Sequence, residues 1–528
     1  MNENPNAIQN IIIVGGGTAG WMSAAYLNKA LNSSGEKCKI TLIEASDIAT
    51  VGVGEATIPV LALFFQSLGI KEAEWMEACN ATYKMGIKFS GWFDNSPQDH
   101  YWHPFGQPAR DKRNKVSLSH YWLKEKNEGY RVPLAKATRE AIQLCDANKS
   151  PRVPYEKDSP KIPYAFHLDA GLLASYLKKI AIEAGVNHLI GKVEKANLDQ
   201  NGFIQSLDTD HHGKLVGDLF IDCSGFAALL LEKTLKEPWV SYADSLLVDR
   251  AVAVSCSYNE GDPYNEQRGG LKPYTTATAQ NAGWSWNTPL ITRDGNGYVY
   301  SSQFASKTDA ETEFMQFLGE KAMNSEARHL KMRIGKFKRS WVKNCVSIGL
   351  SSGFIEPLES TGIAFIQTAI QYLVYNFPDK SFDRVLINNF NQELDKQYEN
   401  TRDFIILHYC LTQREDTPFW KAVKNEAHIP DSVQELIEKS KCMWPNSLFL
   451  EGLMFTDFNY ISVLAGMHHF PKKSLPVLDF YKSYKNHFDA TIQRGVSLAE
   501  SHPTQAEYFK KLYSIDISIP FELITGQM

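Results

Sequence analysis

The sequence lacks three features that would place it in a specialised class. Its eight cysteines stand singly, without a CxxC pair of the kind that binds zinc or exchanges disulfides. Sixty acidic and 55 basic residues leave a formal charge of -5 with no long basic run, which argues against a nucleic-acid partner. There is no run of about 18 apolar residues that could span a bilayer, and the first ten residues contain neither a positive region nor an apolar stretch. We expect a cytoplasmic protein with reduced thiols and no membrane partner.

The composition is that of a folded protein with more than one core. The 528 residues are 43% hydrophobic and 22% charged, and this length usually requires two modules. Strand-like runs occupy the middle of the chain, and long helical stretches dominate from Gly362 onward. The strand-like runs are 215–223, 250–257 and 297–302, and the helical stretches include 362–376 and 392–410. The sequence predicts an α/β fold with a mixed sheet in residues 1–390 and a mainly helical lobe in residues 391–528.

The N-terminal region carries a dinucleotide-binding pattern. Residues 11–14 form a predicted strand, 15–20 read GGGTAG, 21–31 form a helix, and 39–44 form a second strand. In this G-x-G-x-x-G pattern the first glycine permits a tight turn, the second lets the backbone approach a pyrophosphate, and the third allows close helix packing. The predicted cofactor-binding residues of this turn are Gly15, Gly17, Thr18, Ala19 and Gly20. The helix N-terminus would stabilise the negative charge of the phosphates.

Glu44, 24 residues after Gly20, ends the second strand. Its carboxylate is predicted to bind the adenosine ribose, which favours FAD or NAD over a 2′-phosphorylated cofactor. Two later strand-to-glycine turns, 220–225 and 346–357, favour FAD, because a long ligand lying across the sheet would meet them. Gly349 and Leu350 of the second turn are predicted to contact the flavin.

Six motifs then follow one another in a recognisable order. They are GGGTAGW (15–21), VGVGEATIP (51–59), NATYKMGIKF (80–89), HPF (103–105), WSWNTP (284–289) and GFIEPLESTGI (353–363). Together they resemble the flavin-dependent tryptophan halogenases. The resemblance implies an FAD-binding Rossmann-type module related to flavin monooxygenases, with a helical lobe on the substrate side. It also implies that a separate reductase supplies FADH2, that dioxygen and chloride or bromide are converted to hypohalous acid, and that an indole-type ring is halogenated.

Lys84 matches the essential lysine of that family. On sequence alone, residues 83–90 read as one strand with an apolar face, and both Lys84 and Lys88 would lie on the solvated face. The resemblance assigns catalysis to Lys84 only. Its ammonium would hydrogen-bond hypohalous acid, or its amine would form a haloamine, and the sequence leaves both routes open.

Glu359 and Ser360 match the catalytic Glu-Ser pair of the family. A carboxylate there would stabilise the cationic ring intermediate and accept its proton. Thr361 and Gly362 match the halide site, at the N-terminus of a predicted helix where backbone N–H groups are free to bind an anion. An ordinary Ser-Thr helix cap is the other interpretation of this segment, and both could hold at once. Glu356 is expected to have a structural or flavin-side role.

Two further elements of the resemblance concern the flavin side and the substrate. Trp284, Trp286 and Pro289 form the WxWxxP element, which is thought to keep substrate away from the flavin. His103 and Phe105 match residues that line the aromatic pocket around the indole.

The C-terminal part departs from the halogenases that act on free tryptophan. In those enzymes a pair of tyrosines and a glutamate form a clamp for the charged end of the amino acid, and a tryptophan covers its ring. Counted back from residues 464–467, the position of that tryptophan holds Phe455, the glutamate position falls near Leu450, and the paired tyrosines fall near Met443 and Trp444. Glu451 could supply the carboxylate. Because unpaired charges of a buried zwitterion cost several kcal/mol, free tryptophan is predicted to be a poor substrate.

Two alternatives remain open from sequence. One is a flavin monooxygenase that hydroxylates an aromatic ring, and the other is a catalytically silent flavin-binding protein. The sequence also leaves open the native substrate, the halide, the ring position, the reductase and the oligomeric state, for which a homodimer is one option.

Overall fold

The computed structural model describes residues 5–35, 37–47, 54–112, 115–154, 161–258, 270–445, 450, 452–480 and 484–513. By packing, the chain divides into two units, each built from three segments. The first unit comprises Met1–Cys79, Leu168–Ala243 and Met332–Glu399, and the second comprises Asn80–His167, Asp244–Lys331 and Asn400–Met528. The sequence predicted one boundary at residue 390, but no change in composition marks the points where the chain passes between units. The functional lobes 1–390 and 391–528 stay a prediction.

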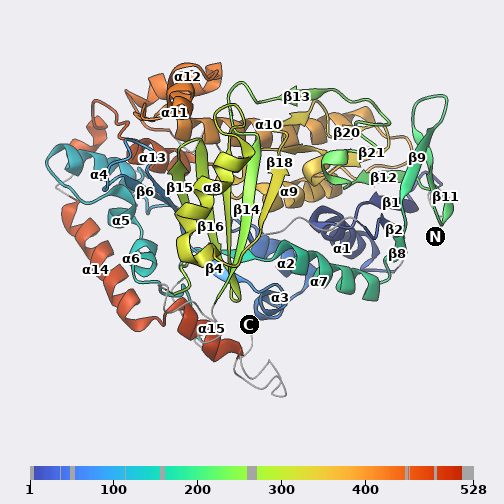
Figure 1. Cartoon of the computed structure of the whole chain (residues 1–528), viewed down its shortest axis with the longest axis horizontal. Helices are drawn as coiled ribbons and strands as arrows, with labels where there is room; N and C mark the ends of the chain where they lie inside the picture. The colour runs from blue at the N-terminus through green and yellow to red at the C-terminus, as the bar shows by residue number, and fades with distance from the viewer. Residues whose placement is uncertain are drawn as a thin grey trace. The chain divides into compact units, whose positions relative to one another are not determined.

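The first unit is organised around a six-stranded sheet in the order β20-β21-β12-β1-β2-β8 (Figure 1). Its strands are β1 (Asn10–Val14), β2 (Lys39–Glu44), β8 (Asn187–Ile190), β12 (Leu219–Asp222), β20 (Trp341–Val342) and β21 (Cys345–Ser347). All neighbours pair in parallel except β20 with β21. The isoleucines of β1 are buried, as expected for a central strand covered on both faces. The carboxyl ends of the parallel strands therefore lie at one edge, where such sheets bind their ligands.

Helices and two small antiparallel sheets complete the first unit. Its helices are α1 (Thr18–Asn32), α2 (Leu61–Leu68), α3 (Glu72–Ala78), α7 (Ala170–Glu183), α9 (Gly362–Tyr375) and the first part of α10 (Arg384–Cys410). The small sheets are β11-β10-β9, with β9 (Val193–Leu198), β10 (Ile204–Thr209) and β11 (Gly213–Val216), and β13-β19-β22, with β13 (Trp239–Ser241), β19 (Gly335–Phe337) and β22 (Gly353–Phe354). The short strand β3 spans Glu55–Ala56.

The second unit contains a seven-stranded sheet in the order β18-β14-β17-β16-β15-β5-β6. Its strands are β5 (Gly86–Ser90), β6 (His100–Pro104), β14 (Arg250–Ser257), β15 (Thr275–Gln280), β16 (Gly283–Pro289), β17 (Arg293–Tyr300) and β18 (Ala327–Lys331). Its pairs are antiparallel, except β15 with β5, which is parallel. A separate strand, β4 (Thr82–Lys84), pairs antiparallel with β7 (Ala165–Leu168).

The remaining elements of the second unit are helices. They are α4 (Leu118–Asn127), α5 (Leu134–Thr138), α6 (Ala141–Asp146), α8 (Lys307–Leu318), α11 (Pro418–Asn425), α12 (Asp431–Ser440), α13 (Asp457–Gly466), α14 (Lys485–Ser501) and α15 (Gln505–Tyr513). Every element that the described residues form after β22 is helical, so the α/β class and the mainly helical C-terminal part are confirmed. Among the same residues, no helix is long and apolar enough to cross a membrane.

Some predicted boundaries were wrong. Helix α1 begins at Thr18 rather than residue 21, because Gly17 is the N-cap and Thr18, Ala19 and Gly20 already form the start of the helix. Residues 215–223 are not one strand but parts of β11 and β12. Residues 83–90 are also not one strand, because the Met85 N–H leaves the ladder and donates to the Pro273 carbonyl oxygen at 2.7 Å.

Candidate functional site

Three of the four glycines in the GGGTAG segment after β1 have no room for a side chain, and the fourth faces open space; at Gly16 a Cβ would lie 1.6 Å from Glu44 Oε2. A Cβ at Gly15, where φ is +111°, would lie 2.3 Å from the Cys223 carbonyl oxygen, and one at Gly20 would lie 1.9 Å from the Gly15 carbonyl oxygen. A Cβ at Gly17, the residue preceding α1, would meet nothing within 4 Å. Backbone packing therefore requires Gly15 and Gly20, whereas Gly17 leaves room beside the N-terminus of α1. This arrangement fits a pyrophosphate at the helix N-terminus.

Glu44 is held by two residues that the sequence did not single out. Its Oε1 accepts a hydrogen bond from Lys178 Nζ at 2.8 Å and also lies 2.8 Å from His188 Nε2. The His188 ring stands edge-on to Trp21, and Lys178 Nζ lies 5.7 Å from the centre of the Trp21 ring. Lys178 and His188 lie more than 130 residues away along the chain, on α7 and β8, and no local motif marks them. They fix the acidic side chain that is predicted to bind the ribose.

The second predicted cofactor segment reaches the glycine turn. A Cβ at Gly349, where φ is +80°, would lie 2.8 Å from the Ala19 Cβ. The next residue, Leu350, is 39% exposed. At the end of β12, the buried carboxylate of Asp222 accepts hydrogen bonds from the backbone N–H groups of Leu230 and Leu231 at 2.7 and 2.9 Å. The three loops at the carboxyl ends of these strands are thus fixed by close packing and by hydrogen bonds to the Asp222 carboxylate.

The predicted Glu-Ser pair lies immediately before α9. Glu359 is 1% exposed and ends a short 3-10 turn, Pro357–Glu359. Ser360 is buried and adopts the left-handed conformation, with φ +61° and ψ 38°, which costs a non-glycine residue about 1–2 kcal/mol. Strain of this kind is often kept at functional sites.

Thr361 and Gly362 begin α9. Thr361 is buried and occupies the residue before the helix, but its side chain makes no capping hydrogen bond to the helix backbone. The ordinary threonine cap, which the sequence left open, is therefore absent here. The backbone N–H groups of the first turn stay the predicted halide site of this segment.

Lys84 in the second unit is fully buried. Its side chain is 0% exposed and its Nζ lies 5.3 Å from the centre of the Phe105 ring. The solvated position expected from strand alternation alone was thus wrong for Lys84, whereas Lys88 is partly exposed and lies 5.7 Å from the Trp102 ring. A buried ammonium is costly unless neighbouring groups compensate for it. The two lysines therefore differ in burial, and the catalytic role of Lys84 stays a prediction.

Buried polar groups fix the strand of Lys84. Thr82 Oγ1 donates to the Pro289 carbonyl oxygen at 2.6 Å and lies 3.2 Å from His167 Nδ1, and His167 Nε2 lies 2.9 Å from Thr275 Oγ1. Burial, followed by the positive charge of Lys84, holds the pKa of His167 well below its usual value. His167 is therefore neutral at physiological pH and adds no second charge beside the lysine. Sequence reasoning missed Thr82, His167 and Thr275, which come from three separate segments.

The Thr82 hydrogen bond also connects this strand to the tryptophan element. Trp284 is 1% exposed, and its ring lies 6.2 Å from that of Trp286. Trp286 pairs with Gly297 on β17, where a Cβ would lie 2.0 Å from the Trp286 ring. The element is thus a rigid β16 segment that ends in Pro289.

His103 and Phe455 form part of one aromatic cluster. The Phe404 ring stacks on Phe455 at 4.0 Å and meets the His103 ring edge-on at 5.4 Å. His103 and Phe455 themselves are 6.3 Å apart. Asn459 Nδ2 lies 2.8 Å from His103 Nε2. Phe404 and Asn459 were not predicted, because they lie on helices α10 and α13 far from the HPF string.

The positions predicted for the amino-acid clamp contain no tyrosine pair. Met443 is 48% exposed, and Trp444 is buried with its ring 6.3 Å from that of Trp122. Leu450 is partly buried, and Glu451 lies outside the described residues.

The predicted residues thus fall into two groups, one in each unit. The first unit holds Gly15, Gly17, Thr18, Ala19, Gly20, Glu44, Gly349, Leu350, Glu359, Ser360, Thr361 and Gly362, and the second holds Lys84, His103, Phe105, Trp284, Trp286, Pro289 and Phe455. Among the residues of the second unit, the structure brings Lys84 close to Phe105 and His103 close to Phe455. Within the described part of the chain, no cluster of three or more His, Cys, Asp or Glu side chains could hold a metal ion.

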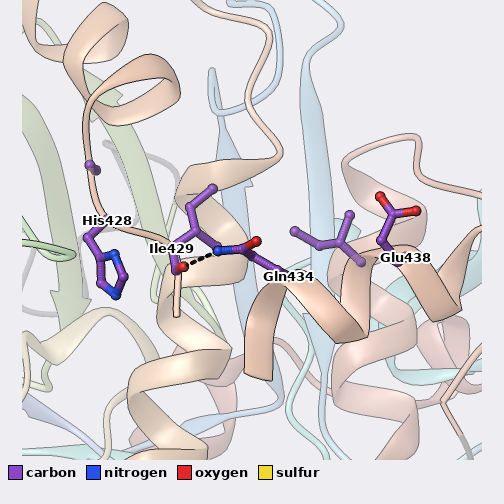
Figure 2. Close-up of a pocket in the computed structure, with 6 residues that line it drawn as sticks. His428, Ile429, Gln434 and Glu438 are labelled. Carbon is purple, nitrogen blue, oxygen red and sulfur yellow. Dashed lines mark hydrogen bonds between the residues drawn. The ribbon is translucent and has the colours of Figure 1, made fainter. Parts of the chain in front are cut away.

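A pocket elsewhere in the second unit carries none of the predicted chemistry. It encloses about 520 Å³ and is lined by Ala427, His428, Ile429, Gln434, Ile437 and Glu438. Figure 2 shows the Gln434 side chain turned back onto the Ile429 carbonyl oxygen, to which it donates at 2.7 Å. The Gln434 amide is therefore already used within the protein.

Known proteins resemble this chain over nearly its whole length. Residues 10–483 match the family model described as tryptophan halogenase. RebH of Lentzea aerocolonigenes, named a tryptophan 7-halogenase, is 40% identical over 538 residues, which cover 96% of this chain and 98% of RebH. ThaL of Streptomyces albogriseolus, named a tryptophan 6-halogenase, is 38% identical over 96% of this chain and 99% of its own length. The crystal structure of SttH, a tryptophan 6-halogenase from Streptomyces toxytricini, superposes with a TM-score of 0.88 at 40% identity and covers 95% of this chain and 99% of SttH.

Proposed function

Because the chain belongs to the tryptophan halogenase family, whose members are flavin-dependent oxidoreductases, we propose that it chlorinates or brominates an indole-type ring other than free tryptophan. A separate flavin reductase would supply FADH2. A cytoplasmic location would give the protein access to the reductase and to FADH2. When bound, the reduced flavin supplies the chemistry that converts dioxygen and halide to hypohalous acid.

The observation that carries the proposal is the burial of Lys84 beside Phe105. An ammonium in an apolar, water-poor environment can donate a strong hydrogen bond to hypohalous acid and make its halogen more electrophilic. The alternative role, a haloamine on Nζ, requires the neutral amine, which burial favours. Neutral His167 leaves Lys84 as the positive charge of this local network.

The other predicted residues have distinct tasks in this proposal. Glu359 would stabilise the cationic ring intermediate and accept its proton, and the strained Ser360 would fix the position of that carboxylate. Thr361 and Gly362 would hold halide at the first turn of α9. His103 and Phe105 would hold the aromatic ring. Trp286, flattened against Gly297, would form a rigid wall on the flavin side.

The substrate proposal depends on the clamp positions. Met443, Trp444 and Leu450 offer no charged side chain to an ammonium or carboxylate group, and Trp444 is packed against Trp122. Leaving the ends of a zwitterion unpaired in a pocket costs several kcal/mol. An indole without a free amino-acid end avoids that cost.

The proposal is tested by supplying FAD, a flavin reductase and NADH with chloride or bromide, and by analysing products from indole and from tryptophan by mass spectrometry. We expect halogenated indole, and a kcat/KM for free tryptophan at least about tenfold lower, which corresponds to about 1.4 kcal/mol. Hydroxylated indole without halogen would support the monooxygenase instead. Binding of FAD without any product would support the silent flavoprotein.

A further inference from the structure

An asparagine contacts the histidine of the aromatic cluster, since Asn459 Nδ2 lies 2.8 Å from His103 Nε2. We propose that Asn459 is a positioning residue that fixes His103 as the neutral Nδ1–H tautomer, with its ring held against the aromatic cluster. The effect of this tautomer on halogenation rests on the proposed function, because that function places His103 beside the substrate ring. The assignment of the tautomer itself does not rest on the proposed function.

The orientation of the Asn459 amide is fixed by the start of α13. Asn459 Oδ1 accepts from the Thr456 backbone N–H at 2.7 Å and from Thr456 Oγ1 at 3.1 Å, as part of a capping box. Gln107 Nε2 donates to the same Thr456 hydroxyl at 2.8 Å, so this hydroxyl uses its single proton toward Asn459. A flipped amide would direct its NH2 group at the Thr456 N–H, and two donors would oppose each other.

The nitrogen of the Asn459 amide then determines which ring nitrogen of His103 carries the proton. Asn459 Nδ2 is a donor and lies 2.8 Å from His103 Nε2, so Nε2 must accept and carries no proton. The ring proton is therefore on Nδ1. The chain of donors runs from Gln107 and Thr456 through Asn459 to His103, and each of these contacts pairs one donor with one acceptor. Protonation of Nε2 would place two donors face to face in a site where His103 is 2% exposed.

Packing holds the ring in the plane that this hydrogen bond selects. Phe404 meets His103 edge-on at 5.4 Å. Phe404 in turn stacks on Phe455, whose backbone N–H donates to Asn400 Oδ1 at 3.0 Å. An imidazole held in this way presents a neutral ring. An imidazolium would repel the positive charge that develops on an aromatic ring during electrophilic substitution.

The test replaces the donor of Asn459 by an acceptor while keeping the helix cap. In Asn459→Asp, one carboxylate oxygen still accepts from Thr456, whereas the other faces His103 Nε2 and requires a proton there. Histidine nitrogens labelled with 15N report the tautomer in long-range 1H–15N spectra, and His103→Gln identifies the His103 signals by their loss. We expect the Nδ1–H form in the unaltered protein and the Nε2–H or doubly protonated form in Asn459→Asp.

The kinetic arm separates positioning from stability. We expect kcat for indole halogenation to fall about tenfold or more in Asn459→Asp, with KM changed less than about threefold. A conservative control, Thr456→Ser, keeps the hydroxyl and should leave both the tautomer and kcat unchanged. An Nε2–H signal for His103 in the unaltered protein would overturn the tautomer, even if Asn459→Asp fails to fold. A changed tautomer with unchanged kcat would overturn the positioning role. Loss of halogenation by the unaltered protein would instead overturn the proposed function.

Discussion

Replacement of Gly17 by alanine should separate cofactor binding from folding at the glycine turn. At Gly17 the backbone has φ -77° and ψ -172°, which alanine adopts without strain, and the added Cβ would meet nothing within 4 Å. The apoprotein should therefore unfold at an unchanged or slightly higher temperature, since a Gly→Ala change at a compatible site is worth about 0.4–1 kcal/mol through the unfolded state. If the pyrophosphate of the cofactor lies against Gly17, the added methyl group would occupy the same space as the pyrophosphate.

We expect Gly17→Ala to weaken FAD binding about 10- to 100-fold, or about 1.4–2.8 kcal/mol. Gly20→Ala is the matched control, because its Cβ would lie 1.9 Å from the Gly15 carbonyl oxygen. That variant should lose stability in the apoprotein, by about 1–3 kcal/mol or more. Calorimetric titration gives the dissociation constant, and thermal unfolding without cofactor gives the stability. FAD binding by Gly17→Ala with unchanged affinity would refute the placement of the pyrophosphate.

Three further changes test other parts of the structure. Thr82→Val removes the buried donor to Pro289, and thermal unfolding should show a loss of about 1–3 kcal/mol, while an unchanged midpoint would contradict the hydrogen-bond network. Asp222→Asn sets an NH2 group against backbone donors and should destabilise the apoprotein by about 2–4 kcal/mol, and a neutral effect would show that the loop does not need the carboxylate. Burial, followed by the negative charge of Asp169, raises the pKa of Glu55 to about 7. The folded state therefore holds a proton that the unfolded state releases above about pH 4.5. The free energy of unfolding should fall by about 1–3 kcal/mol as the pH rises from 5 to 8. In Glu55→Gln that part of the pH dependence should vanish, and an identical profile would contradict the assignment.

The sequence was sufficient where function depends on neighbouring residues. The glycine turn, the strand that ends at Glu44 and the helix that starts at Gly362 each lie within one short segment, so local spacing predicts them. The motif assigns different tasks to Gly15, Gly17 and Gly20, but only the structure shows which atoms a Cβ at each position would meet. The Cys223 carbonyl oxygen, which a Cβ at Gly15 would meet, follows β12, far along the chain.

The groups that tune each predicted residue could not be read from the sequence. Lys178 reaches Glu44, Asn459 reaches His103, and His167 lies near Lys84, each from a segment at least 80 residues away. Strand alternation placed Lys84 on a solvated face because it assumed one continuous strand. The break at Met85 moves the lysine into a different sheet pairing, and tertiary packing buries it.

The central claim, that oxidant passes through Lys84, is tested most directly by comparing Lys84→Ala with Lys88→Ala in the coupled reductase assay with indole and bromide. Both variants remove one lysine from neighbouring strands, but only Lys84 is fully buried. The account predicts that Lys84→Ala still binds FAD and consumes NADH and dioxygen yet forms no halogenated indole, whereas Lys88→Ala retains most of the activity. Halogenated indole at the unaltered rate from Lys84→Ala would contradict it.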